Sequence, residues 1–63
     1  MKLPITAQNA AFAADLLRRE IDLESMRLHG ARRAYDNARI GAHCERLAEL
    51  RAELARAESM LEA

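Results

Sequence analysis

The sequence has little of what builds sheets, disulfides and enzyme pockets. Its 63 residues include one Cys, one Pro, two Gly, one Phe and one Tyr, with no Trp and no Val. A single Cys excludes a disulfide within the chain, and the shortage of β-branched and aromatic residues disfavours a sheet. A chain this short also has too little core to wall a concave pocket, so we expect no enzyme activity, no catalytic residue and no cofactor.

The sequence also lacks a net charge and a long apolar run. Ten basic residues balance ten acidic ones, and the longest apolar run, residues 10–14, is far too short to cross a bilayer. No apolar segment of the kind that directs secretion follows Lys2. The amphipathic segments carry no unbalanced cationic face, which membrane-surface helices need. These observations predict a cytoplasmic protein that does not bind membranes.

Helix-forming residues are abundant. The chain holds 14 Ala, nine Leu and nine Arg, and 51% of its residues are apolar. These residue types favour helices, and so high an apolar fraction at zero net charge argues against disorder. We therefore predict an all-α protein with one domain over residues 1–63.

Local signals divide the chain into an arm and two helices. Pro4 indicates an extended start, and Thr6 is a suitable N-cap for the helix that follows. Gly30 is the best stop signal, because glycine is favoured just after the end of a helix. The predicted elements are an arm over residues 1–6, a helix over 7–29 and a helix over 31–61. Together they form an antiparallel helical hairpin.

A later turn is the alternative. The apolar stripe of the first helix can be continued through Ala31 to Tyr35, which would move the turn into residues 36–41. Asp36 and Asn37 are both acceptable caps, and a glycine inside a helix costs only about 1 kcal/mol. We favour the earlier turn, at the glycine.

The second predicted helix carries the clearest pattern. Its seam residues recur at alternating spacings of three and four, as in a heptad repeat. The seam consists of Ile40, His43, Leu47, Leu50, Leu54, Ala57 and Leu61. A coiled coil between copies and a hairpin core share this pattern, so the seam predicts either.

The first predicted helix is apolar on two sides. One face carries Leu17, Ile21 and Leu28 with Ala10 and Ala14, and nearly opposite lie Phe12, Leu16, Leu23 and Met26. A helix of this kind usually packs against two neighbours. We expect one face to contact the second helix and the other to contact a dimer mate or a foreign protein.

These features predict a binding function. Short helical chains often gain the missing core by self-association, so we expect a homodimer that forms a four-helix bundle. We predict a non-enzymatic protein–protein interaction module, an adaptor or an inhibitor that occludes a regulatory protein or enzyme, of a size that suits a phage- or plasmid-borne antagonist. The candidate partner surface comprises Phe12, Leu16, Leu23, Met26, Arg32, Arg33 and Tyr35.

Nucleic-acid binding is the alternative function. The central segment is basic, with Arg27, Arg32, Arg33 and Arg39 beside His29 and Tyr35. A dimer would double this segment and could use it to follow phosphates. The zero net charge and the acidic C-terminal segment disfavour this alternative.

Metal binding is not expected. His43, Cys44 and Glu45 are consecutive, and consecutive residues point about 100° apart on a helix. The three side chains therefore cannot converge on one ion. Cys44 is interpreted as a small apolar residue beside the seam.

Overall fold

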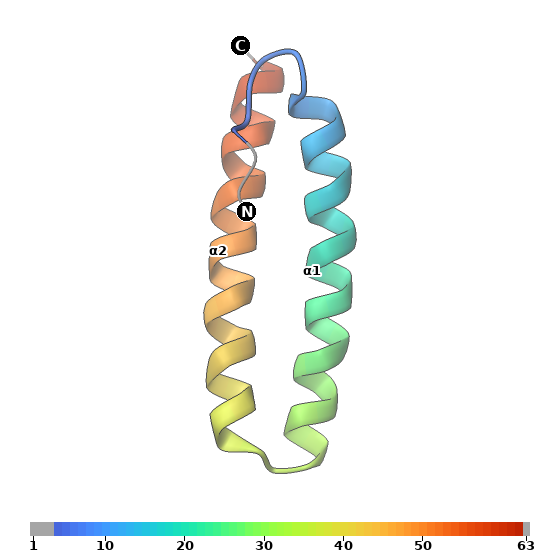
Figure 1. Cartoon of the computed structure of the whole chain (residues 1–63), viewed down its shortest axis with the longest axis vertical. Helices are drawn as coiled ribbons and strands as arrows, with labels where there is room; N and C mark the ends of the chain where they lie inside the picture. Colours follow the sequence, from blue (N-terminus) through green and yellow to red (C-terminus); the bar gives the residue numbers. More distant parts are fainter. Residues whose placement is uncertain (1–3, 63) are drawn as a thin grey trace.

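The computed structural model describes residues 4–62 as two helices packed against each other (Figure 1). Helix α1 spans Ala10–Arg33 and helix α2 spans Asn37–Glu62. They run antiparallel in an elongated molecule of 42 × 20 × 14 Å. The predicted all-α helical hairpin is confirmed. Residues 1–3 of the predicted arm and residue 63 lie outside the described residues.

The turn lies later in the chain than predicted. Helix α1 continues through Gly30 and ends at Arg33, and α2 begins at Asn37. The turn at Gly30 and a second helix from residue 31 are therefore wrong, and the alternative interval 36–41 meets the real turn only at Asp36. Continuing the helix buries Ala31, which is only 6% exposed, and Gly30 costs the helix only about 1 kcal/mol.

Backbone hydrogen bonds at the turn explain why α1 ends there. The N–H of Tyr35 donates to the carbonyl of Arg32 (3.2 Å), and the N–H of Asp36 donates to that of Ala31 (3.0 Å). This pair of bonds is the Schellman motif, whose C′ residue adopts a left-handed conformation. Tyr35 fills that position with φ 54°. The Asp36 carboxylate then accepts the N–H of Arg39 (3.1 Å) and so caps α2.

The start of α1 also differs from the prediction. Thr6 and Asn9 exchange hydrogen bonds: the Thr6 N–H donates to Asn9 Oδ1 (2.8 Å), and the Asn9 N–H donates to Thr6 Oγ1 (3.3 Å). The Asn9 side chain also donates to the carbonyl of Pro4 (2.9 Å). These bonds close a turn over residues 7–9, so the helix begins at Ala10 rather than at residue 7. The described part of the arm arches over the open end of the hairpin (Figure 1).

The core lies in the single interface between α1 and α2. Its buried apolar residues are Ala10, Ala14, Leu28 and Ala31 from α1 and Leu47, Leu50 and Ala57 from α2. The α1 side follows a heptad pattern that we call the inner stripe, made of Ala10, Ala14, Leu17, Ile21, Glu24, Leu28 and Ala31. Alanines occupy both ends of the inner stripe, and its larger apolar residues, Leu17, Ile21 and Leu28, lie between them.

Candidate interaction surface

A second heptad pattern runs along the far side of α1. Its members follow one another at spacings of four and three and form the outer stripe: Phe12, Leu16, Arg19, Leu23, Met26, Gly30 and Arg33. Each lies two residues beyond a member of the inner stripe, which is about 200° around a helix. The apolar members of the outer stripe therefore face away from α2, whereas Gly30, near the turn, also lines a shallow depression with Ala42 and His43 of α2.

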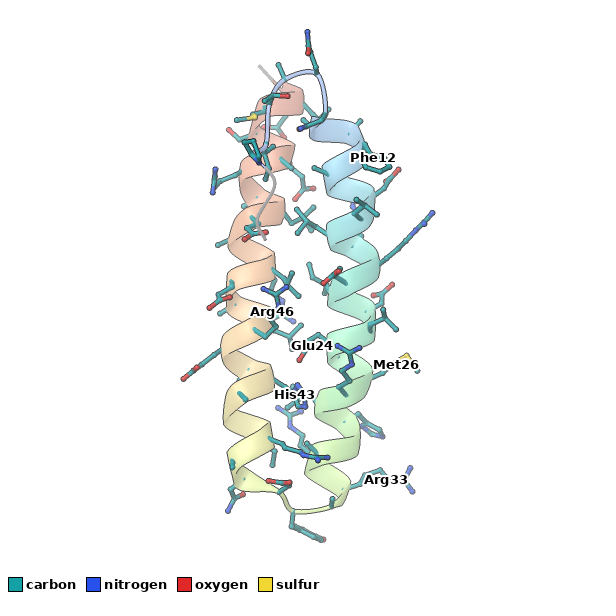
Figure 2. All side chains as sticks on the ribbon, in the orientation of Figure 1. Phe12, Glu24, Met26, Arg33, His43 and Arg46 are labelled. Carbon is teal, nitrogen blue, oxygen red and sulfur yellow. The ribbon has the colours of Figure 1, made fainter. Side chains whose placement is uncertain are left out.

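The large apolar side chains of the outer stripe are open to solvent. Phe12 is 65% exposed, Leu23 53% and Met26 71%, while Leu16 is 39% exposed. Figure 2 shows Phe12 and Met26 pointing away from α2. The structure thus places all four apolar residues of the predicted partner surface on one exposed face. The hairpin completes its own core without them.

The other predicted partner residues lie at the turn end of the hairpin. Arg32, Arg33 and Tyr35 are all exposed, and the ring of Tyr35 is 88% exposed at the tip. Between this end and the middle of the hairpin, Arg32 and His29 from α1 and Arg51 from α2 line a shallow depression. Two other arginines of the basic segment already bind acids, because Arg27 contacts Glu24 and Arg39 contacts Asp36.

The seam of α2 faces α1 within the same chain. Leu47, Leu50 and Ala57 are buried, and Ile40, His43 and Leu54 are half-buried. Leu61, at the end of the seam, is 49% exposed. The seam therefore supplies the hairpin core, and it is the outer stripe of α1 that remains uncovered.

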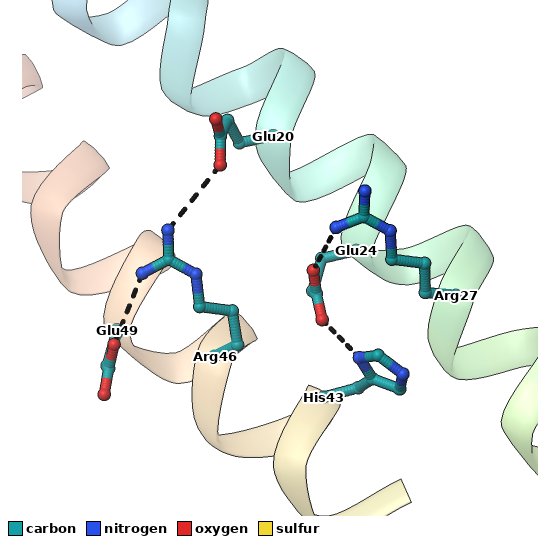
Figure 3. A network of polar contacts seen from close by, with 6 residues as sticks. All are labelled: Glu20, Glu24, Arg27, His43, Arg46 and Glu49. Carbon is teal, nitrogen blue, oxygen red and sulfur yellow. Dashed lines mark hydrogen bonds and ion pairs between the residues drawn. The ribbon is translucent and has the colours of Figure 1, made fainter. Parts of the chain in front are cut away.

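A charged residue that the sequence analysis missed interrupts the inner stripe. Glu24 is only 6% exposed and lies between the helices, where it accepts hydrogen bonds from His43 Nδ1 of α2 and from Arg27 Nη1 (3.1 Å) (Figure 3). The hydrogen bond from His43 is the main cause that lowers the pKa of Glu24; burial opposes this effect, and Arg27 adds to it. The heptad spacing could have revealed Glu24, because it fills the inner-stripe position between Ile21 and Leu28.

Ion pairs join the exposed edges of the two helices. Arg46 of α2 lies 3.6 Å from Glu20 of α1 and 3.4 Å from Glu49 of its own helix (Figure 3). Arg18 of α1 lies 3.5 Å from Glu58 of α2. Exposed pairs of this kind each contribute about 0.2–1 kcal/mol, so they assist the pairing of α1 with α2 without deciding it.

Among residues 4–62, no three His, Cys, Asp or Glu side chains are grouped so that they could hold a metal ion. Cys44 is an exposed free cysteine. The side chain of the neighbouring His43 points toward Glu24 of α1 (Figure 3). Neither α1 nor α2 is long and apolar enough to cross a membrane.

No protein-family model, no curated protein and no solved structure matches this chain. The surfaces described above are therefore the basis for a functional proposal.

Proposed function

We propose that this protein is a small non-enzymatic protein–protein interaction module. It acts as an adaptor, or as an inhibitor that binds and occludes a regulatory protein or enzyme. The observation that carries this proposal is the outer stripe of α1, where Phe12, Leu16, Leu23 and Met26 are exposed. The hairpin packs its core on the opposite side of α1, so these residues are surplus to its own folding.

The shape and chemistry of the outer stripe suit a helical partner. Large apolar side chains at spacings of three and four match the apolar face of another amphipathic helix. Aromatic and methionine residues are enriched at such interfaces. At the turn end, Arg32, Arg33 and Tyr35 provide a second contact, because arginine and tyrosine are frequent interface anchors. The partner protein would present an apolar helix and, beside it, acidic groups.

Self-association belongs to the same proposal. Two helices enclose a thin core, in which Leu50 is the most deeply buried large side chain, at 2% exposure. Covering the outer stripe would remove a further set of apolar side chains from water, at about 25 cal/mol for each Å² of apolar surface. We therefore propose that the hairpin dimerises into a four-helix assembly.

Affinity capture with matched variants tests the proposed function. The tagged chain and a Leu23→Asp variant would each be exposed to an extract of the source cell, with Leu61→Asp as the control. Leu61 is 49% exposed and Leu23 is 53% exposed, so the two variants place the same charge at similar exposure on different surfaces. We expect proteins that the original chain and Leu61→Asp retain and that Leu23→Asp loses, identified by mass spectrometry. Identical retention by all three chains would overturn the proposal.

The depression lined by Arg32, His29 and Arg51 supports nucleic-acid binding as the second candidate. Arg32, His29 and Arg51 lie close enough to line one depression, and such a group could contact phosphates. Binding of that kind would weaken steeply as salt is raised. The test is a mobility shift with RNA and DNA at two salt concentrations, comparing the original chain with Arg32→Glu. The absence of a salt-dependent shift would rule out this candidate.

A further inference from the structure

We infer that the outer stripe of α1 binds the outer stripe of a second copy of this chain, with the two α1 helices antiparallel. This inference rests on the proposed function, because it names the occupant of the same surface. Four observations carry it: the heptad spacing of the stripe, the sizes of the facing side chains, the position of the stripe charges, and the opposite charges of the two ends of the hairpin.

The sizes of the stripe residues match only when the second copy is antiparallel. In antiparallel heptad packing, the two kinds of seam position face each other across the interface. When Leu23 faces Arg19 of the second copy, Leu16 faces its Met26, and Phe12 faces its Gly30. The largest side chain of the stripe then meets the smallest, and no atom lies within 4 Å of a Cβ built on Gly30. Gly30 thus leaves the room that the ring of Phe12 needs.

Shifts of one heptad leave apolar residues without a counterpart. In one direction Phe12 would face residue 37, beyond the end of α1, and in the other Met26 would face residue 9, before its start. Only the alignment with Leu23 opposite Arg19 keeps every apolar member of the stripe over the helix of the second copy.

The charged residues of α1 fit the same alignment. Arg19 faces Leu23 of the second copy and reaches Asp22 beside it, so a cation and an anion meet twice around the two-fold axis. Asp15 lies across from His29 of the second copy, and the same offset places the two Asp22 carboxylates across from each other, between the two Arg19 side chains. In a parallel pairing, the two Arg19 side chains would face each other and repel. The two Phe12 rings would also face each other and be crowded. The stripe therefore disfavours a parallel pair.

The two ends of the hairpin also carry opposite charge. Residues 24–46 form the turn half, with five arginines against three acids, and the remaining described residues carry seven acids against four arginines. The antiparallel arrangement places the basic half of one copy beside the acidic half of the other. Complementary potentials of this kind favour one orientation of association.

The inferred dimer has a definite layout. Because inner and outer stripes lie on nearly opposite sides of α1, the two α1 helices lie in the middle and the two α2 helices lie outside. Arg32 and Tyr35 stay uncovered at each turn, one turn at either end of the assembly. The dimer would therefore present two copies of the turn surface to an external protein.

Exchanging the facing residues tests the inference. Sedimentation equilibrium would compare the original chain, Phe12→Ala, Gly30→Phe and the double variant Phe12→Ala/Gly30→Phe. Each single change should raise the dimer dissociation constant on the order of 10- to 100-fold, since one creates a cavity and the other a clash. The double variant again places a large side chain opposite a small one, with the two positions exchanged, and should return to within about 5-fold of the original constant. Gly41→Phe is the control, because Gly41 also has open space around its Cβ but lies on α2, and it should leave the constant unchanged.

The possible outcomes separate this inference from the proposed function. A chain that stays monomeric at all measurable concentrations overturns the second copy as occupant, and the capture experiment still decides whether a foreign protein binds the stripe. A dimer that Phe12→Ala does not weaken lies on another surface and also overturns it. A dimer that both single variants weaken, without recovery in the double variant, overturns the antiparallel pairing. Recovery in the double variant supports it, whatever the capture experiment shows.

Discussion

The inner and outer stripes of α1 share a spacing but differ in what they carry. The buried inner stripe has three alanines and a glutamate among its seven residues, whereas the exposed outer stripe has Phe12, Leu16, Leu23 and Met26. Four of the seven large apolar side chains of α1 therefore lie on the face that α2 does not cover. The alanines allow close approach of α2, and Glu24 finds its partner His43 there. The difference teaches that α1 carries more large apolar side chains than the hairpin core uses, and that the excess lies on one face of the helix.

Equal truncations on the two stripes should have very different effects on folding. Leu28, on the inner stripe, is 8% exposed, and Leu23, on the outer stripe, is 53% exposed. Leu28→Ala should lower the free energy of unfolding by about 2–5 kcal/mol, while Leu23→Ala should change that of the dilute protein by about 0.5 kcal/mol or less. Thermal melting followed by circular dichroism, at a low and a 100-fold higher concentration, measures both.

Concentration separates the roles of the two leucines. Leu28→Ala should be destabilising at both concentrations, and Leu23→Ala only at the higher one, where self-association contributes to stability. Similar losses for both variants in dilute solution would show that the outer stripe belongs to the core of the single hairpin.

The charged member of the inner stripe should make the hairpin sensitive to acid. The hydrogen bond from His43 lowers the pKa of Glu24 in the folded chain. Its carboxylate therefore stabilises the fold above the ordinary glutamate pKa of about 4.3, and this contribution is lost as the pH falls through the lowered pKa. We expect the Tm to fall over this acid range, and the Tm of Glu24→Gln to be lower at pH 7 and to change less with acid.

Glu45 provides the matched control, because it is exposed on α2. Glu45→Gln should keep the acid dependence of the original chain. If Glu24→Gln and the original chain lose helicity in parallel as the pH falls, Glu24 does not contribute this sensitivity.

Tyr35 is the next position of the inner-stripe spacing after Ala31, but it lies in the turn and is not buried. The residue stands in the left-handed region with φ 54° and is 88% exposed. Because glycine adopts this conformation without the clash of a Cβ, Tyr35→Gly should raise the free energy of unfolding by about 1 kcal/mol. Ala34→Gly, one residue earlier at φ −86°, should not raise it. A lower stability for Tyr35→Gly in urea unfolding would mean that the ring itself supports the fold.

The smallest expected change in stability comes from substituting the two glycines, Gly30 and Gly41. Each has open space where a Cβ would stand, so Gly30→Ala and Gly41→Ala should each raise the free energy of unfolding of the dilute protein by about 0.5–1 kcal/mol. At high concentration the gain at Gly30 should be the smaller one, because only Gly30 lies on the outer stripe. Equal gains at every concentration would argue against a close neighbour at Gly30.

Heptad spacing was enough to predict the apolar faces of both helices. The seam of α2 and the two apolar sides of α1 follow from the positions of the large apolar residues alone. Leu47 and Leu50 are buried, and Phe12 and Met26 are exposed. What spacing could not decide was which side of α1 would face α2, because both sides follow the same repeat and both carry large apolar residues.

The position of the turn and the burial of Glu24 each result from several interactions together, so no single residue in the sequence predicts them. Gly30 is a strong local stop signal, but burial of Ala31 and capping by Asp36 together favour a longer α1. The Schellman motif then requires a left-handed residue at a position occupied by Tyr35, where glycine would have been expected. Glu24 is buried because His43 and Arg27 reach it from two helices, a meeting that the alignment of the helices creates.

That meeting has a consequence for how α1 can slide along α2. A heptad repeat looks nearly the same after a displacement of seven residues, which is about 10 Å. After such a slide, Glu24 would meet Leu50 in one direction or Asp36 in the other, and neither side chain donates a hydrogen bond to a carboxylate. One polar pair therefore distinguishes the native alignment from its near-equivalents, as a single buried polar residue does in coiled coils. If Glu24 and His43 were both leucine, the interface between the helices would gain apolar surface. It would also lose the polar contact that distinguishes the native alignment from the others.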